Sequence, residues 1–183
     1  MRIPFFIIAL VLVAPHNLFA QTRDTRGSIA AIAGAGRTWD DESQIGSGAA
    51  VGGRVDWRLI GNTRVEGAVE LFGHDRNDVF QAHGHTVLAS ASLVQRFGAA
   101  AVQPYVLGGV TVAHHSGTTQ LGTGPTRRHT STDTGYHFGG GLAVRLGQRF
   151  EIGPEARFYI LQADNDSDPA WADWFGVRFG VRF

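Results

Sequence analysis

The sequence predicts an all-β protein, an eight-stranded antiparallel transmembrane β-barrel with up-and-down topology. Apolar and polar residues alternate with a period of two along most of the chain, which is the pattern of strands with two different faces. The connections are alternately short and long, as in transmembrane β-barrels, whose turns are short on one side of the membrane and longer on the other. A mean hydropathy of −0.05 argues against a protein built from several membrane-spanning helices.

Residues 1–20 are predicted to be a secretory signal peptide. Arg2 supplies a positive N-terminal region, an apolar stretch follows from Ile3, and Ala20 ends the segment on a small residue. The apolar stretch spans about a dozen residues, fewer than the roughly 20 that a membrane-spanning helix needs. We therefore expect the chain to be exported and residues 21–183 to form a single domain.

The composition excludes several classes of function. Sixteen basic residues, all of them Arg, balance 16 acidic residues, so the chain lacks the basic excess of a nucleic-acid-binding protein. The chain has no Cys, which excludes a disulfide scaffold, a thiolate zinc site, an iron–sulfur cluster and a thiol nucleophile. We expect no cofactor.

Eight segments carry the alternation. These predicted strands are residues 27–38, 46–59, 63–72, 85–97, 103–115, 135–146, 150–161 and 171–183. The first is built mostly of small residues, so its facing is ambiguous. In the second and third, Val, Leu and Trp on one face oppose Arg, Asp and Glu on the other. The fourth and fifth fit the same scheme, and in the sixth and seventh an apolar and aromatic face opposes Gly, Arg and Glu. The last strand sets aromatic residues and Val against Arg and Gly.

The connections follow the same alternation. The short ones each contain a Gly and are residues 60–62, 98–102 and 147–149. The long ones hold most of the Asp, Ser and Thr and are residues 39–45, 73–84, 116–134 and 162–170. A closed barrel of such strands would satisfy every backbone hydrogen bond in lipid and leave no free sheet edge.

Three segments resemble a known family. The run Trp174–Phe183 resembles the C-terminal strand of Gram-negative outer-membrane β-barrels, and the runs that begin at Pro104 and Gly153 resemble strands of small OmpA/OmpX-type barrel domains. The resemblance covers the whole mature chain and implies a place in the cell outer membrane. It also implies that the barrel assembly machinery reads the terminal strand. The residues that match this assembly signal are Phe175, Val177, Phe179, Val181 and Phe183.

The predicted register sends most charged strand residues into the barrel. An eight-stranded barrel is just wide enough for side chains to fill it, and buried charges persist there when they are paired and hydrogen-bonded. The predicted interior charge network is Arg54, Asp56, Arg64, Glu66, Glu70, Arg96, Arg145, Glu155, Arg157 and Arg178. The same register points Arg58, Glu151 and Arg182 inward. The network acts either as a structural plug or as a gated pathway whose ion pairs rearrange to let small ions pass. In the second case, we expect the rearrangement first at Glu155 with Arg157 and at Arg64 with Glu66 and Glu70.

His114 and Ser116 are the catalytic candidates. They lie two residues apart, so in a strand they share a face, here the lipid-facing one, and a His can activate a Ser toward an acyl ester. The pair resembles the His-x-Ser-Asn motif of outer-membrane lipid A deacylases. Gly117 replaces the expected Asn, and no acid stands at a matching place in residues 135–146. We therefore expect a protein that is not an enzyme.

Metal binding is not expected either. The His residues gather near the long connections, where His83 and His85 form the best local pair for Zn²⁺ or Cu²⁺, but carboxylate ligands at a recognisable spacing are missing. The run Asp164–Pro169 resembles the opening of a calcium loop without its sixth-position Gly and closing Glu.

The predicted function is a structural or surface-interaction role through the extracellular loops. Arg127 and Arg128, in the longest connection, are the predicted contacts for lipopolysaccharide phosphates or an external partner. The alternatives are a narrow channel for small solutes or ions and, from another class, a lipid A-modifying hydrolase; a soluble periplasmic β-sandwich is the alternative fold. Expected partners are outer-membrane lipids, lipopolysaccharide and the barrel assembly machinery, with no nucleic acid, and we expect a monomer.

Overall fold

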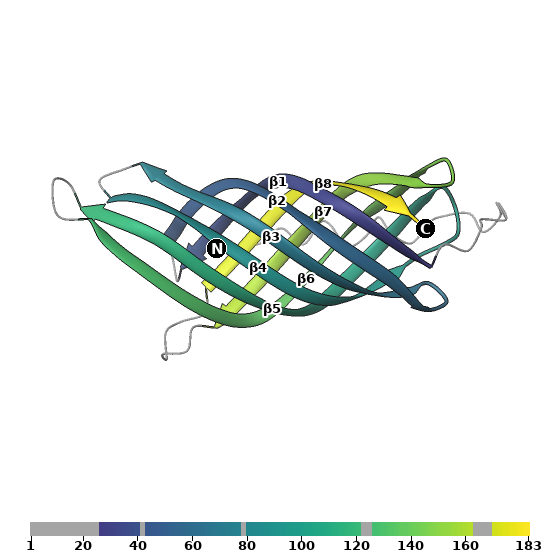
Figure 1. Cartoon of the computed structure of the whole chain (residues 1–183), viewed down its shortest axis with the longest axis horizontal. Coiled ribbons are helices and arrows are strands. Elements are labelled where there is room, and N and C mark those ends of the chain that lie inside the picture. The colour runs from purple at the N-terminus through teal and green to yellow at the C-terminus, as the bar shows by residue number, and fades with distance from the viewer. Residues whose placement is uncertain (1–25, 41–42, 78–79, 122–125, 163–169) are drawn as a thin grey trace, which may run out of the picture.

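The chain forms a closed antiparallel barrel, which confirms the predicted fold class (Figure 1). The computed structural model describes residues 26–40, 43–77, 80–121, 126–162 and 170–183. Its strands are β1 (Gly27–Asp40), β2 (Ser43–Ile60), β3 (Thr63–Asn77), β4 (Phe80–Arg96), β5 (Val102–Leu121), β6 (Arg127–Leu146), β7 (Phe150–Gln162) and β8 (Ala170–Arg182). Each strand pairs with the next along the chain. The predicted signal peptide lies outside the described residues.

Pairing of β1 with β8 closes the barrel. The two strands run antiparallel from Ser28 opposite Arg182 to Trp39 opposite Trp171. Small residues permit their close approach, because a Cβ added at Gly34 would lie 2.4 Å from the carbonyl oxygen of Phe175. Closure removes the last free sheet edge and satisfies the backbone groups that lipid cannot.

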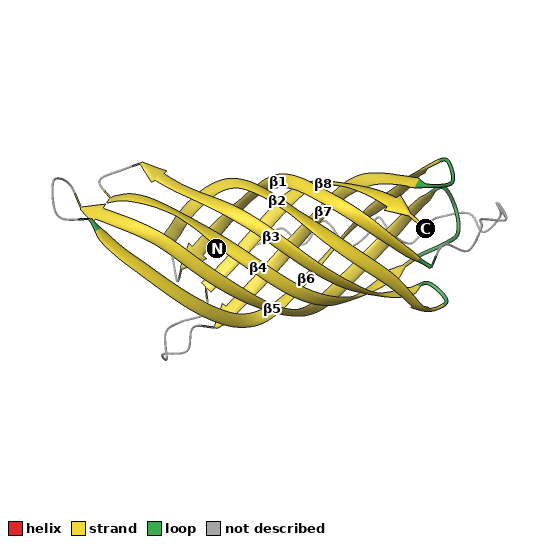
Figure 2. Ribbon diagram, in the orientation of Figure 1, coloured by secondary structure: helices red, strands yellow, loops and turns green. Residues whose placement is uncertain are grey.

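The three short turns lie together at one end of the barrel, here named the turn end (Figure 2). Their glycines Gly61, Gly98 and Gly147 have φ angles of +53°, +75° and +70°. This left-handed region is costly for residues with a Cβ and open to glycine. The predicted short connections are therefore confirmed, and their glycines are needed for the backbone path.

The opposite end, here named the hairpin end, differs from the prediction. The connection predicted over residues 116–134 is mostly strand, since β5 continues to Leu121 and β6 begins at Arg127. The strands β3 and β4 also reach Asn77 and Phe80, inside the connection predicted over 73–84. The prediction failed because it required apolar alternation. Beyond the bilayer both faces of a hairpin are polar, and Thr-rich segments favour strands there without alternating.

The two longest strands extend well past a membrane. The strands β5 and β6 have 20 residues each. At about 3.3 Å per residue and a tilt of about 40°, such a strand advances about 50 Å, twice the roughly 25 Å apolar band of these barrels. The outer face of β5 changes accordingly from Val112 to His114, and that of β6 from Tyr136 to Thr134. The membrane boundary therefore lies near Tyr136.

Apolar side chains cover the outer face of the barrel and most charged strand residues lie inside. Burial alternates residue by residue along β7 and β8, as a pleated strand requires. The structure also shows which side chains of β1 face the lumen, which the sequence left ambiguous. Ile29 is 56% exposed on the outer face, whereas Ile32 is buried in the lumen. In the described residues, no helix is long and apolar enough to cross a membrane.

Candidate functional site

The lumen of the barrel is filled by side chains that form distinct layers. An apolar layer lies toward the hairpin end and a charged layer follows it. A smaller apolar cluster of Val94, Tyr105, Leu107 and Ala143 leads to a second charged layer at the turn end. The residues of the first apolar layer are Ile32, Ala50, Phe72, Leu88, Ala113, Tyr159, Leu161, Ala172 and Trp174. We call this layer the apolar plug.

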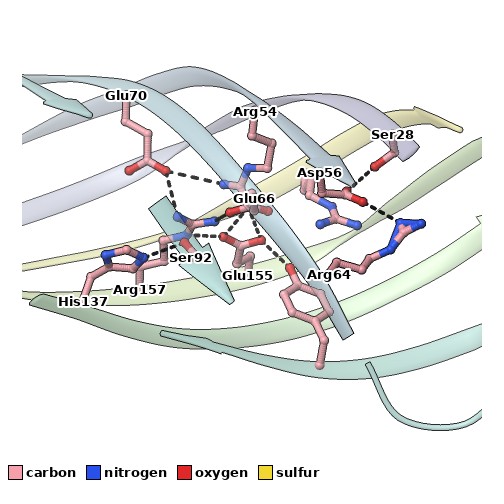
Figure 3. Close-up of polar contacts among 12 residues, drawn as sticks. Ser28, Arg54, Asp56, Arg64, Glu66, Glu70, Ser92, His137, Glu155 and Arg157 are labelled. Carbon is pink, nitrogen blue, oxygen red and sulfur yellow. Dashed lines mark hydrogen bonds and ion pairs between the residues drawn. The ribbon is translucent and has the colours of Figure 1, made fainter. Parts of the chain in front are cut away.

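The central charged layer joins β2, β3 and β7 across the lumen (Figure 3). Arg157 donates to Glu155 and to Glu66, at 2.6 and 2.5 Å, and lies 3.6 Å from Glu70. Arg54 donates to both oxygens of Glu155 at 2.6 Å and lies within 3.6 Å of Glu66. All five side chains are essentially inaccessible to solvent. Two guanidinium groups thus bind three carboxylates, the shared geometry that the planar fork of Arg favours.

Aromatic side chains connect the central charged layer to its apolar neighbours. Tyr159 and Trp174, both in the apolar plug, donate hydrogen bonds to Glu70. From the other side Tyr105 donates to Glu155. A buried carboxylate without such donors would be strongly destabilised, so these contacts stabilise the packing of the charged layer against its apolar neighbours.

The second charged layer lies at the turn end. Asp56 accepts hydrogen bonds from Ser28 and Arg64, and Glu151 accepts from Arg96 and Arg178. Arg64 therefore pairs with Asp56, whereas Glu66 and Glu70 pair with the central Arg54 and Arg157. The expectation that Arg64 forms one unit with Glu66 and Glu70 is replaced by this division into two layers.

Two residues that the register sends inward lie at the mouth of the lumen. Arg145 is half-buried and donates to Gln103 at 2.8 Å and to the carbonyl oxygen of Ala99 at 3.3 Å. Arg58 is likewise half-buried. Both residues lie near the end of a strand, where fewer neighbouring side chains cover an inward-facing residue, so the alternation of faces alone overestimates their burial.

A His-centred contact that sequence reasoning missed lies at the hairpin-end mouth. His115 Nδ1 is 2.6 Å from Thr86 Oγ1, and its Nε2 is 3.0 Å from Asp133 Oδ2, which ties β4, β5 and β6 together. The period-two alternation of the strands could have revealed this contact, because it places both His115 and Asp133 on the inward face. Deeper in the lumen, His137 lies 2.8 Å from both Ser92 and Thr111.

A family model of the outer membrane protein beta-barrel domain matches residues 6–183. The chain belongs to this family. It is therefore an outer-membrane β-barrel protein, and the turn end of such barrels faces the periplasm. No curated protein matches the chain.

Solved structures share the fold of this outer-membrane barrel. Neisserial surface protein A has a TM-score of 0.62 at 14% identity, over 86% of this chain and 97% of that one. Ail, the attachment invasion locus protein of Yersinia pestis, was solved with the heparin analogue sucrose octasulfate and has a TM-score of 0.60 at 16% identity, over 88% and 100%. The N-terminal barrel domain of Pseudomonas aeruginosa OprF has a TM-score of 0.52 at 18% identity, over 85% of this chain and 98% of that one. At these identities the likeness concerns the fold.

The predicted assembly signal lies on the lipid-facing side of β8 and just after it. All five of its side chains are exposed: Phe175, Val177, Phe179, Val181 and Phe183. The rings of Phe183 and Trp57 approach to 6.0 Å at the periplasmic end. The signal is therefore accessible along one face of the terminal strand, and its reading by the assembly machinery stays a prediction.

The catalytic candidates share the outer face of β5, as the spacing predicts. They lie beyond Val112, however, on the polar part of the strand and not on the lipid-facing part that was predicted. His114 is exposed, and its Nδ1 lies 3.0 Å from the hydroxyl of Thr132. Ser116 lies opposite Thr130 on β6 and His85 on β4. The His114 ring therefore contacts Thr132 of the neighbouring strand. A catalytic His would instead contact the Ser nucleophile and an orienting acid.

The remaining predicted contacts lie at the hairpin end. Arg127 and Arg128 are strand residues of β6, opposite Thr119 and Thr118, and Arg128 is exposed. They are therefore held on a hairpin rather than in a long loop. Where the structure describes side chains, no three of His, Cys, Asp or Glu are grouped to hold a metal ion. The side chains of Arg127 and His83 and the run Asp164–Pro169 lie outside that part.

Proposed function

We propose that this outer-membrane barrel is not an enzyme and acts at the cell surface through its extended extracellular hairpins. The observation that carries the proposal is the packing of the lumen. The apolar plug contains the fully buried Phe72, Leu88 and Trp174, and a layer of five interlocked charges lies beneath it. Close-packed interiors leave little room for a solute, whereas β5 and β6 project polar surface beyond the bilayer.

Arg127 and Arg128 are the proposed contacts for an anionic surface ligand, lipopolysaccharide phosphates or an external partner. They begin β6, on the hairpin whose two strands are the longest of the described barrel. Arg recognises phosphate through its planar fork, and a paired strand holds the backbone of such a contact more rigidly than a free loop. Ail, a neighbour of the same fold solved with a sulfated sugar, supports the choice of a polyanion.

The double variant Arg127→Ala with Arg128→Ala tests this contact. Lipopolysaccharide binding by the refolded protein in micelles should weaken several-fold, while the heat-dependent gel mobility of the barrel stays unchanged. Arg149→Ala, which removes an exposed Arg at the periplasmic end, is the matched control and should bind normally. Equal binding by the double variant and the control would refute the proposal.

A narrow channel is the second candidate, because ion pairs line the lumen between its two apolar layers. If the pairs exchanged partners, small ions would pass along them. In planar bilayers the proposed function predicts no single-channel conductance for the wild-type protein. Conductance that changes in Glu155→Gln, which weakens the contacts of Glu155 with Arg54 and Arg157, would establish the channel instead.

A further inference from the structure

The outer wall of the barrel carries a hollow that crosses the neighbouring strands β1 to β6 and ends beside Gln162 of β7 (Figure 1). Its volume is about 860 Å³, which lies within the range of about 300–1,000 Å³ that ligand pockets have. The hollow lies on the outer face, because side chains that line it, such as Val69 and Val110, are 56% and 55% exposed. Its lining is mainly apolar.

Small residues create the hollow. On β3 and β4 the next outward residues are larger, Leu71 toward the hairpin end and Leu93 toward the turn end, and both are exposed. A Cβ added at Gly67 would meet no atom within 4 Å, so the hollow is open at this residue. The hollow is therefore a groove between two rows of larger side chains. The outward residues of its floor are Gly53, Gly67, Ala89 and Ala91.

The groove climbs the barrel wall from the periplasmic side to the outer membrane boundary. At its lower end Ile29 lies two residues after Gly27, the first residue of β1, whereas Tyr136 lies ten residues before Leu146, the last residue of β6. Five interstrand spacings of about 4.8 Å give a length of about 24 Å, which a strand tilt of about 40° converts to a rise of about 15 Å. That rise equals half of the roughly 30 Å hydrocarbon core of a bilayer.

Polar groups lie at the outer end of the groove. Thr134, Tyr136 and Gln162 line it there, close to the membrane boundary. Just beyond them His114 and Thr132 are exposed on the outer face. Hydroxyl, amide and imidazole groups can each donate or accept a hydrogen bond, as recognition of a sugar requires. The groove thus offers a long apolar surface with a sugar-compatible rim at one end.

We propose that this groove binds one acyl chain of a lipopolysaccharide molecule, with the sugar headgroup beside Thr134, Tyr136 and Gln162. The outer face of the barrel lies in lipid, and an unfilled groove would forfeit the dispersion contacts of its lining, so hydrocarbon is the occupant that the setting supplies. A polar rim at the outer end alone fits an amphiphile of the outer leaflet. The site lies on the barrel wall and is separate from the hairpin contact proposed above.

Native mass spectrometry tests the proposal. The protein is refolded into vesicles of phosphatidylethanolamine and lipid A and extracted in a mild uncharged detergent, and the lipid that stays bound is identified. All variants carry Arg127→Ala with Arg128→Ala, so that lipid held at the hairpin does not contribute and the two proposals fail separately. In this background the barrel should retain lipid A. Gly67→Leu and Ala91→Leu, which fill the groove from two strands, should each lower retention about tenfold, the value of about two buried methylene groups.

Gly73→Leu is the matched control. Gly73 lies on the same strand and outer face beyond Leu71, and a Cβ there would be 3.9 Å from the carbonyl oxygen of Ala49, an ordinary contact. This variant should retain lipid A undiminished, and heat-dependent gel mobility verifies that each variant is folded.

Several results would overturn the proposal. They are the absence of retained lipid A, undiminished retention in Gly67→Leu and Ala91→Leu, and an equal loss in Gly73→Leu. Retention of phosphatidylethanolamine in place of lipid A would assign the groove to a phospholipid. A dimer that Gly67→Leu abolishes would assign it to a second copy of this chain.

Discussion

Replacement of Arg157 by Met tests whether the central charged layer stabilises the barrel as one unit. Arg157 is fully buried, and it lies 2.5 Å from Glu66, 2.6 Å from Glu155 and 3.6 Å from Glu70. Met is unbranched like the stem of Arg, shorter, and uncharged. After the change, Arg54 is the one remaining guanidinium of the layer, facing three carboxylates that stay buried.

The cost of this change follows from the contacts. Removal of one partner from a buried ion pair typically costs about 3–5 kcal/mol, because the other charge is left without compensation. Here three carboxylates lose a partner together, so we expect the free energy of unfolding to fall by the upper part of that range, about 4–5 kcal/mol. Adding Glu66→Gln removes one of the uncompensated charges and should recover part of the loss, as coupled neighbours do.

Urea unfolding in micelles, followed by far-ultraviolet circular dichroism, measures these free energies. Arg37→Met is the matched control. Arg37 donates to Asp173 at 2.9 and 3.1 Å, but its side chain is 53% exposed, and a solvent-exposed ion pair contributes at most about 1 kcal/mol. A loss in Arg157→Met no larger than in Arg37→Met would refute the reasoning that burial makes the central layer a single stabilising unit.

Two further predictions concern the outer face. Phe183→Ala should lower the fraction of heat-modifiable barrel in outer-membrane fractions of cells and leave refolding in micelles nearly unchanged, because Phe183 is half-exposed and lies on the outer face beside Trp57. An equal loss in both assays would indicate a packing role instead. Mass spectra of lipid A from cells with wild-type protein and with Ser116→Ala should be identical, since the His114 ring contacts Thr132; a difference between the spectra would establish deacylation.

Much of this architecture is encoded locally. Neighbouring side chains on a pleated strand point to opposite faces, so period-two alternation alone correctly assigned Arg54 and Glu66 to the lumen and Phe175 to lipid. Gly61, Gly98 and Gly147 marked the tight turns because their backbone conformation disfavours residues with a Cβ. Beyond the bilayer both faces of a strand meet water, so apolar and polar residues no longer alternate there. The sequence prediction therefore underestimated the lengths of β5 and β6.

The sequence by itself determined the strand number, the facing of the side chains in every strand but β1, and the membrane setting, because those properties depend on residues near one another in the chain. Only the tertiary structure decided which charges meet. Arg54 binds Glu155 across 101 residues, and Arg157 binds Glu66 across 91. Barrel closure and strand stagger bring these non-adjacent strands face to face across the lumen, and no local pattern encodes that distance.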